Sequence, residues 1–286
     1  MDEIGNMCES KDADPTWKIM YMSESAVIFI LNFFTLIAFA RNRHLRKRTM
    51  YLVINLTVAD LLVGGVTIPL IAFVEPGQDR PILEHTVELS QSLFFPATLI
   101  NLSLIALDRL HATLFPFRHC LIGGSFYCKV IAGNWLVALL IACTIQIVHF
   151  LFQIIPVCAY VCIILITAII IIVCYVSIAV NVNKGKTHHH NLGAISSETK
   201  LSLTLFIMTA ASVLTILPIT IWWAFECGNN CLEKLVGRNV LEALTALYFV
   251  NSVVNPLIYA LRMRAFRKIM KALFCKTSGQ NLVAPH

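Results

Sequence analysis

Seven long apolar stretches constrain this chain more than any other feature of its sequence. Each holds roughly 20 residues or more, which is the length that an α-helix needs to cross a bilayer. They lie at 21–40, 51–74, 84–114, 127–149, 154–182, 199–225 and 236–260. Isoleucine-rich runs such as residues 163–173 lack the alternating polarity of a membrane β-strand. The sequence therefore predicts an all-α integral membrane protein, a seven-transmembrane helix bundle.

The composition of the chain supports the same class. Hydrophobic residues make up 58% of the 286 residues and charged residues only 13%, whereas a soluble domain carries about 25% charged residues. The sequence has no long hydrophilic loop that would indicate a second domain, and no internal repeat of the kind found in transporters. We therefore expect one membrane domain over residues 21–261.

Basic residues gather in alternate connecting segments, and this asymmetry predicts the orientation of the chain. Lys and Arg follow the first, third, fifth and seventh apolar stretches, whereas the N-terminal tail and the segment around Glu84 are acidic. Basic loops remain in the cytoplasm. We expect a multi-pass plasma-membrane protein with an extracellular tail over 1–20 and a cytoplasmic segment over 262–286. The net charge of +6 reflects this topology and does not suggest nucleic acid as a partner.

Asp60 is the only acidic residue that the sequence places deep in a span. A carboxylate at that depth must be protonated, paired or bound to a cation. The oxygen atoms of side chains on other spans could complete a small Na⁺ site with it: Thr98, Asn251 and Ser252. The same groups could instead form hydrogen bonds that only hold the helices together. The sequence leaves both interpretations open.

The last apolar stretch is interrupted by Asn255 and Pro256, with Tyr259 three residues further on. Proline removes a backbone hydrogen bond, and lipid tolerates the freed carbonyl only where a neighbouring group or water satisfies it. A basic segment from Arg262 onwards follows directly. This pattern indicates a deformable, hydrated segment at one face of the membrane.

An ordered set of motifs resembles the rhodopsin-like (class A) G-protein-coupled receptors over essentially the whole chain. The sequence N-L-T-V-A-D occupies 55–60, D-R-L occupies 108–110, and N-P-L-I-Y occupies 255–259. Single residues also stand at family positions: Trp135, Tyr175, Glu198 and Pro218. The resemblance implies a receptor that binds an extracellular ligand and activates a heterotrimeric G protein, and it implies that the protein is not an enzyme.

The resemblance also implies how the switch works. Arg109, next to Asp108, would pair with Glu198 in the resting state and hold the sixth helix inward. Agonist binding would favour an outward position of that helix. Arg109 and Tyr175 would then move towards Tyr259 and open a cytoplasmic cleft for the G protein. Such a two-state element, biased from two sites, is what allostery requires.

Cysteine residues near both ends of the receptor suggest covalent modifications. The resemblance implies a short amphipathic helix 8 that contains Phe266. It also implies a palmitoyl group on Cys275 that anchors this segment in the membrane lipid. Cys227 and Cys231 are close enough in sequence for a local disulfide, with Cys8 as a competing partner.

The chain departs from the family where the ligand pocket meets the switch. Ile216 stands in place of the usual tryptophan two residues before Pro218, Thr167 replaces a proline, and Ser212 replaces a phenylalanine. The connector beneath the pocket is therefore unusual, so we expect high basal activity or weak coupling between ligand and switch.

The outer end of the bundle most resembles the melanocortin receptors, which belong to a wider group with adenosine, cannabinoid and lysophospholipid receptors. Glu84 and Glu88 match two acids that help those receptors bind Ca²⁺ and a basic peptide, although a third acid is absent because Leu70 takes its place. Helical spacing puts Glu84, Glu88 and Gln91 on one face. We expect a ligand site formed by these three and by aromatic walls: Trp222, Trp223 and Tyr248.

Other interpretations remain open at this stage. The two acids also suit a helix N-terminus at a water interface, and the aromatic residues also suit a lipid interface. An adenosine-type or lipid-type ligand is the alternative to a basic one. A transporter or channel would need more polar residues at membrane depth than Asp60 provides.

Overall fold

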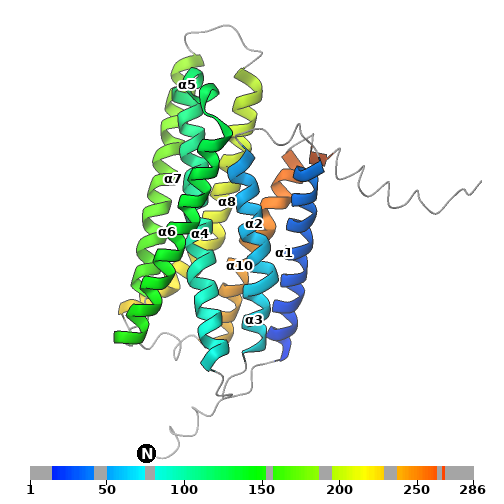
Figure 1. Ribbon diagram of the computed structural model, residues 1–286, viewed down its shortest axis with the longest axis vertical. Helices are drawn as coiled ribbons and strands as arrows, with labels where there is room; N and C mark the ends of the chain where they lie inside the picture. The colour runs from blue at the N-terminus through cyan, green and yellow to red at the C-terminus, as the bar shows by residue number, and fades with distance from the viewer. Residues whose placement is uncertain are drawn as a thin grey trace, which may run out of the picture.

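The computed structural model describes residues 15–41, 50–74, 81–152, 157–186, 195–228, 237–262 and 266–267. Within these ranges, seven helices are long and apolar enough to cross a membrane, which confirms the predicted all-α bundle. Figure 1 shows the seven spans running side by side along the long axis of the molecule.

Six of the spans are single helices: α1 (Pro15–Arg41), α4 (Pro81–Leu114), α6 (Gly124–Phe152), α7 (Val157–Lys186), α8 (Ile195–Gly228) and α10 (Arg238–Arg262). The remaining span, the second along the chain, has three parts, α2 (Tyr51–Leu62), the π-helical η3 (Val63–Thr67) and α3 (Ile68–Phe73). A short helix, α5 (Pro116–Leu121), joins α4 to α6.

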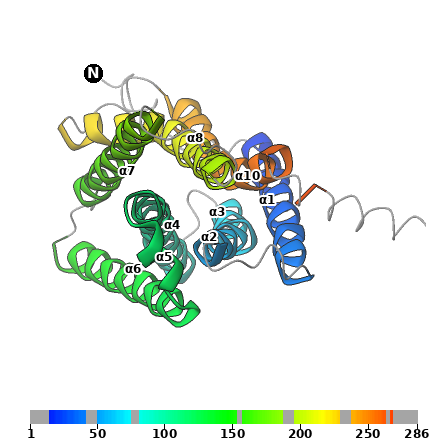
Figure 2. The ribbon, with the colours of Figure 1, turned by 90° about the horizontal axis from the view of Figure 1, so that it is seen from above.

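Helix α4 is the central element of the bundle. It contacts α2, α6, α7 and α8, and the view along the bundle shows it enclosed by these helices (Figure 2). The largest buried apolar cluster lies in the half of the bundle nearer α5, and includes Leu102, Tyr175, Leu205, Met208 and Tyr259. We refer to this end of the bundle as the α5 end. The long apolar stretches supply both this core and an apolar exterior. Because lipid offers no water, the backbone groups of each span form their hydrogen bonds within the helix.

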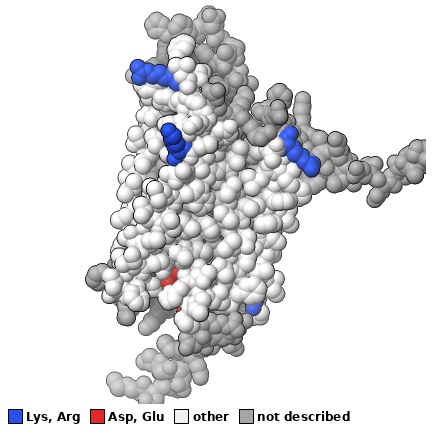
Figure 3. Space-filling model, viewed as in Figure 1, with Lys and Arg blue, Asp and Glu red and all other residues white. Residues whose placement is uncertain are grey.

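The exterior of the bundle is suited to lipid. Figure 3 shows a broad middle band of one face on which no described Lys, Arg, Asp or Glu is visible. Large apolar side chains point outwards on several spans, as Leu140 on α6 and Ile169 on α7 do. Exposed apolar surface of this kind belongs to a lipid interface when it surrounds a bundle of spans.

The second span is distorted where it passes α1. A Cβ atom on Gly64 would lie 2.6 Å from Cγ2 of Ile28, so only glycine permits this approach of the two helices. The hydroxyl of Ser25 donates a hydrogen bond of 2.6 Å to the carbonyl of Gly64. This bond satisfies a backbone oxygen within the π-helical turn, which precedes Pro69.

The helix boundaries differ from the expected ones mainly at α1. The helix begins at Pro15, so the last residues of the tail predicted over 1–20 are helical. Proline suits the first turn of a helix, and Trp17 anchors this turn by donating a 3.1 Å hydrogen bond to Asn239 at the start of α10. Of the expected helix 8, only Phe266 and Arg267 are described, and they are helical.

Candidate functional site

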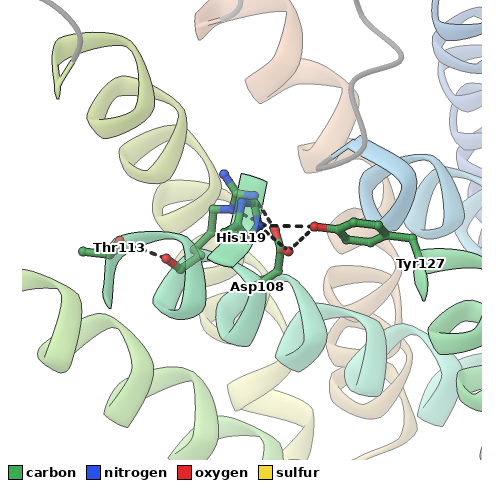
Figure 4. Close-up of polar contacts among 5 residues, drawn as sticks. Asp108, Thr113, His119 and Tyr127 are labelled. Carbon is green, nitrogen blue, oxygen red and sulfur yellow. Dashed lines mark hydrogen bonds and ion pairs between the residues drawn. The ribbon is translucent and has the colours of Figure 1, made fainter. Parts of the chain in front are cut away.

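Asp108 is the centre of a polar cluster at the α5 end (Figure 4). One carboxylate oxygen, Oδ2, accepts hydrogen bonds from Nε and Nη2 of Arg109. The other, Oδ1, accepts a 2.7 Å hydrogen bond from the hydroxyl of Tyr127 and lies 3.1 Å from Nε2 of His119. Charge-assisted bonds of this kind are about twice as strong as neutral ones. One carboxylate therefore ties together α4, α5 and α6.

The local sequence explains how these residues meet. Helix α4 ends at Leu114, Phe115 leaves the helical conformation, and Pro116 begins α5. Proline at this position has its φ angle preset for a new helix and lacks an amide hydrogen that would go unbonded. The turn brings His119 back to Asp108, while Tyr127 is buried in the first turns of α6.

Arg109 is fully buried, with no exposed side-chain surface. A buried guanidinium is tolerated only where it is paired and hydrogen-bonded, and Asp108 supplies that partner. Tyr175 on α7 is buried in the apolar cluster of the α5 end. The ring of Tyr175 packs edge-on against Phe206 of α8, with 4.9 Å between centroids. The structure thus brings together Asp108 and Arg109, and it buries Tyr175 in the apolar cluster of the same end.

The remaining predicted switch residues lie on α8 and α10. Tyr259 is fully buried, and its hydroxyl donates a 3.0 Å hydrogen bond to the sulfur of Met208 on α8. Its ring packs edge-on against Phe39 of α1 and Phe266. Glu198 belongs to α8, but its side chain lies outside the described part of the structure, as do the side chains of Cys227, Cys231 and Cys275.

Asp60 is fully buried and hydrogen-bonded to α10. Its carboxylate accepts 2.9 Å and 2.8 Å bonds from Ser252 and Asn255. Oδ1 of Asn251 and Oδ1 of Asn255 are also buried, and neither has a hydrogen-bond partner. Thr98 on α4 is buried as well. The donor set is rich in oxygen with acceptors left over, so its chemistry fits a small hard cation with water.

A second amide network crosses the bundle between α2, α4 and α6. Trp135 donates a 2.9 Å hydrogen bond to Oδ1 of Asn55, whose amide nitrogen donates a 3.0 Å bond to Asn101. Asn101 in turn donates to the backbone oxygen of Leu52. Trp135 therefore forms a specific hydrogen bond in addition to packing. Its position in the sequence could not distinguish these two roles.

At the opposite end of the bundle the two acids of α4 differ. Glu84 is exposed, whereas Oε2 of Glu88 is buried. That oxygen lies 3.3 Å from Nδ1 of His149 on α6 and 3.5 Å from Nδ1 of His85. Among the described residues, no group of three or more His, Cys, Asp and Glu is arranged to hold a metal ion.

The aromatic residues expected near these acids are in two environments. Trp223 and Tyr248 pack around Phe95 of α4, together with Tyr160 of α7. Trp222 is buried, and its indole nitrogen has no hydrogen-bond partner. Gln91 is half-buried on α4. The structure therefore brings Trp223 and Tyr248 together and leaves Glu84 at the surface.

Several residues of these clusters were not predicted. His119, Tyr127, Phe95 and Tyr160 have no motif of their own, and only their partners in space reveal them. Glu24 on α1 was not predicted either, although both of its carboxylate oxygens are buried without a hydrogen-bond partner. Its place three residues after Tyr21, inside an apolar stretch, was the available signal.

Comparison with known proteins finds relatives over most of the chain. A family model described as 7 transmembrane receptor (rhodopsin family) matches residues 31–259. The chain is 24% identical to the adenosine receptor A2b of Gallus gallus, over 92% of this chain and 91% of that receptor. It is 24% identical to the sphingosine 1-phosphate receptor 3 of Takifugu rubripes, over 90% and 70%. The match to the neuropeptide F receptor of Drosophila melanogaster, at 28% identity, covers 49% of this chain and 30% of that receptor.

Proposed function

Because the chain belongs to the rhodopsin family of seven-transmembrane receptors, we propose that it transmits the signal of an extracellular ligand to a heterotrimeric G protein. The observation that carries this proposal is the buried Arg109, which is held by Asp108 at the α5 end. Burying the charged guanidinium costs free energy. Such a charge, next to the cluster shared by α4, α5 and α6, suits a switch rather than a structural bridge.

The α5 end is the cytoplasmic one in this proposal, and the plasma membrane is the location. Arg41 ends α1, Arg118 lies on α5, Lys129 lies near the start of α6, and Arg262 ends α10. All four are at the α5 end, because successive spans alternate in direction. Basic residues remain on the cytoplasmic side, so the tail before α1 would be extracellular.

Activation would exchange the partners of Arg109. In the resting state Asp108 holds it, with Glu198 of α8 as a second acid. An agonist would favour an outward position of the α5 end of α8, which contacts α10 through Met208 and Tyr259. Pro218 interrupts the hydrogen bonds of α8 and gives that helix a place to bend.

Helix α5 supplies a surface for the G protein. Phe117 is 88% exposed and Leu121 is 83% exposed, and both lie within five residues of His119 of the Asp108 cluster. Such exposed apolar side chains beside a switch suit the buried centre of a protein–protein interface. Neither residue belongs to a motif that the sequence singled out.

The ligand is proposed to carry a basic group that pairs with Glu88. The buried oxygen of this carboxylate has imidazole neighbours but no hydrogen bond of good geometry, so a cationic ligand would add a charge-assisted bond. This chemistry favours a ligand with a basic group, such as a basic peptide. An adenosine-type ligand is the alternative, supported by the full-length match to the adenosine receptor A2b.

Two cations are proposed to act on the receptor. Na⁺ would bind at Asp60, Ser252 and Asn251, with Thr98 nearby, and would favour the resting state. Ca²⁺ would accompany the ligand at Glu84 and Glu88, because carboxylate oxygens suit hard cations. Two acids cannot fill the Ca²⁺ coordination shell, so backbone oxygens, water or the ligand would supply the rest. We propose a receptor without enzymatic activity.

The experiment that tests this function is a second-messenger screen. Cells that express the protein are exposed to peptides, nucleosides and lipids while cAMP and Ca²⁺ are recorded. The expected result is a response to a basic ligand that weakens about tenfold or more in a Glu88→Gln variant, because a partly desolvated ion pair is lost. Glu84→Gln removes the same charge from an exposed position and should change the response less. Equal effects of the two substitutions would contradict the assignment of Glu88.

A further inference from the structure

In the outer half of the bundle, the contact of α8 with its neighbouring helices is centred on an unexpected residue. The family's tryptophan is replaced by Ile216, which is buried in a cluster with Phe95, Leu99 and Ile164. Isoleucine is short and has no ring that could report a ligand's position to neighbouring helices. The ring in this cluster comes from α4 instead, since Phe95 is the only aromatic residue among its four buried members in the described structure.

Phe95 contacts one aromatic residue on each of three other spans. Its ring centroid lies 5.7 Å from Tyr160 on α7, 6.1 Å from Trp223 on α8 and 5.4 Å from Tyr248 on α10. All three pairs are edge-to-face, with interplanar angles of 62°, 89° and 72°. Edge-to-face pairs are the favoured geometry for aromatic rings and are directional. A movement of one of these helices therefore changes its contact with Phe95.

Hydrogen bonds connect this ring cluster to the backbone of α4 at Glu88. Ser92, fully buried one turn before Phe95, bonds to the hydroxyl of Tyr160 at 2.9 Å and to the backbone oxygen of Glu88 at 2.7 Å. Gln146 of α6 donates to the same hydroxyl of Ser92. Residues 88, 92 and 95 have the i, i+4, i+7 spacing of one helix face. A group that binds at Glu88 thus lies two helical turns above Phe95, on the same face.

We propose that Phe95 is the positioning residue that couples the ligand end of this receptor to α8, in place of the tryptophan that the chain lacks. The proposal rests on the receptor function argued above. In the arrangement seen here, the ring of Phe95 holds Trp223, five residues beyond Pro218, against α4. A ligand that displaces the ring frees Trp223 from this contact, so that the two halves of α8 bend independently at Pro218 and the α5 end can move outwards.

The neighbouring residue Phe94 provides a matched control. It stands on the same helix and packs edge-to-face at 6.3 Å against Trp135 on α6. It also borders the apolar cluster of Ile68 and Phe249, and it is not part of the cluster of Ile216. Phe95→Leu and Phe94→Leu each remove one ring from α4 and keep an apolar side chain. Phe95→Tyr keeps the ring and tests whether the ring itself is what matters.

The first measurement is basal G-protein activation in cells, at matched surface expression. Phe95→Leu should raise it about fivefold, the lower end of typical allosteric coupling, whereas Phe94→Leu and Phe95→Tyr should stay near wild type. Trp223→Leu should reproduce the rise, and the double variant Phe95→Leu with Trp223→Leu should show no additional effect, because both remove the same contact. Equal basal activity in the Phe95→Leu and Phe94→Leu variants would overturn the proposal.

The second measurement does not depend on a G protein. Hydrogen–deuterium exchange of the purified receptor is followed over residues 202–215 of α8, on the far side of Pro218 from Trp223. Phe95→Leu should accelerate exchange there about twofold or more, because the helix opens locally more often, and Phe94→Leu should not. If Phe95→Leu accelerates exchange but neither the wild type nor any variant activates a G protein, the role of Phe95 is retained and the G-protein function is contradicted. Signalling that responds to Arg109→Ala, with equal exchange in both leucine variants, would contradict the role of Phe95 alone.

Discussion

Tyr259 of α10 donates a hydrogen bond of 3.0 Å to the sulfur of Met208 on α8. Both side chains are fully buried, so the bond joins the two helices where no water competes for it. A thioether is a weak acceptor, and a weak bond suits a contact that must break when α8 moves. Among the described side chains, this hydrogen bond is the polar contact that joins α8 to α10 near the α5 end.

The substitution Met208→Leu should raise basal signalling. Leucine keeps the apolar volume but removes the acceptor, which leaves the Tyr259 hydroxyl without a partner in the resting arrangement. A typical side-chain hydrogen bond contributes about 0.5–1.5 kcal/mol. A bond to a weak thioether acceptor falls in the lower part of this range, so a rise of about two- to fivefold is expected. Leu205→Met, in the same buried cluster, is the control and should leave basal signalling unchanged. Basal G-protein activation in cells measures both, and equal values for the two variants would contradict the role of Met208.

The substitution Asp108→Asn should raise basal signalling more strongly. It removes the negative charge that holds Arg109 and lies beside His119, while the size of the side chain stays the same. Breaking a buried ion pair costs about 3–5 kcal/mol when one charge is left unpaired, so surface expression should also fall. Signalling per receptor at the surface is therefore the quantity to compare.

Tyr127→Phe is the graded companion of that variant. It removes only the 2.7 Å hydrogen bond to Asp108, so its effect on basal signalling should have the same direction and a smaller size. A larger effect of Tyr127→Phe than of Asp108→Asn would show that the charge of Asp108 is not what restrains Arg109.

The substitution Asp60→Asn should abolish the dependence of basal activity on Na⁺. The carboxylate of Asp60 is the only formal negative charge in its hydrogen-bonded group with Ser252 and Asn255, and an amide attracts a cation far less. Nucleotide exchange on the G protein is measured in membranes as Na⁺ is replaced by choline at constant ionic strength. Wild type should lose basal activity as Na⁺ rises. The same Na⁺ dependence in Asp60→Asn would leave this residue as a hydrogen-bonding group only.

The architecture of the bundle could be predicted because it follows from local, one-dimensional signals. Each span needs about 20 apolar residues in lipid, and a stretch of that length can be found in the sequence without knowledge of any contact. The placement of Asp60 near Ser252 was also predictable, since polar groups at membrane depth turn inwards to find each other. Its bond to Asn255 was not predicted, because that residue was assigned to the switch motif. The start of α1 was not, because Pro15 and Trp17 become helical through a hydrogen bond to Asn239, more than two hundred residues away.

The contacts within the candidate site depend on tertiary packing and were only partly predictable. His119 reads as a solvated loop residue until the turn at Pro116 brings it to Asp108. Phe95 reads as one apolar residue among many in α4, and its role depends on rings from three other helices. Glu24 lies inside an apolar stretch, but only the packing of α1 shows that its carboxylate oxygens are buried. In each case the decisive partner is distant in the sequence.

The account depends most directly on Arg109, so the decisive measurement is G-protein activation by an Arg109→Ala receptor at wild-type surface expression. Arg109 is proposed to leave Asp108 and line the cleft that the G protein enters, so the variant should show little or no basal or agonist-stimulated activation. Arg41→Ala, an exposed arginine at the end of α1, is the control and should retain most of the signal. Normal activation by a well-expressed Arg109→Ala receptor would contradict the proposed switch.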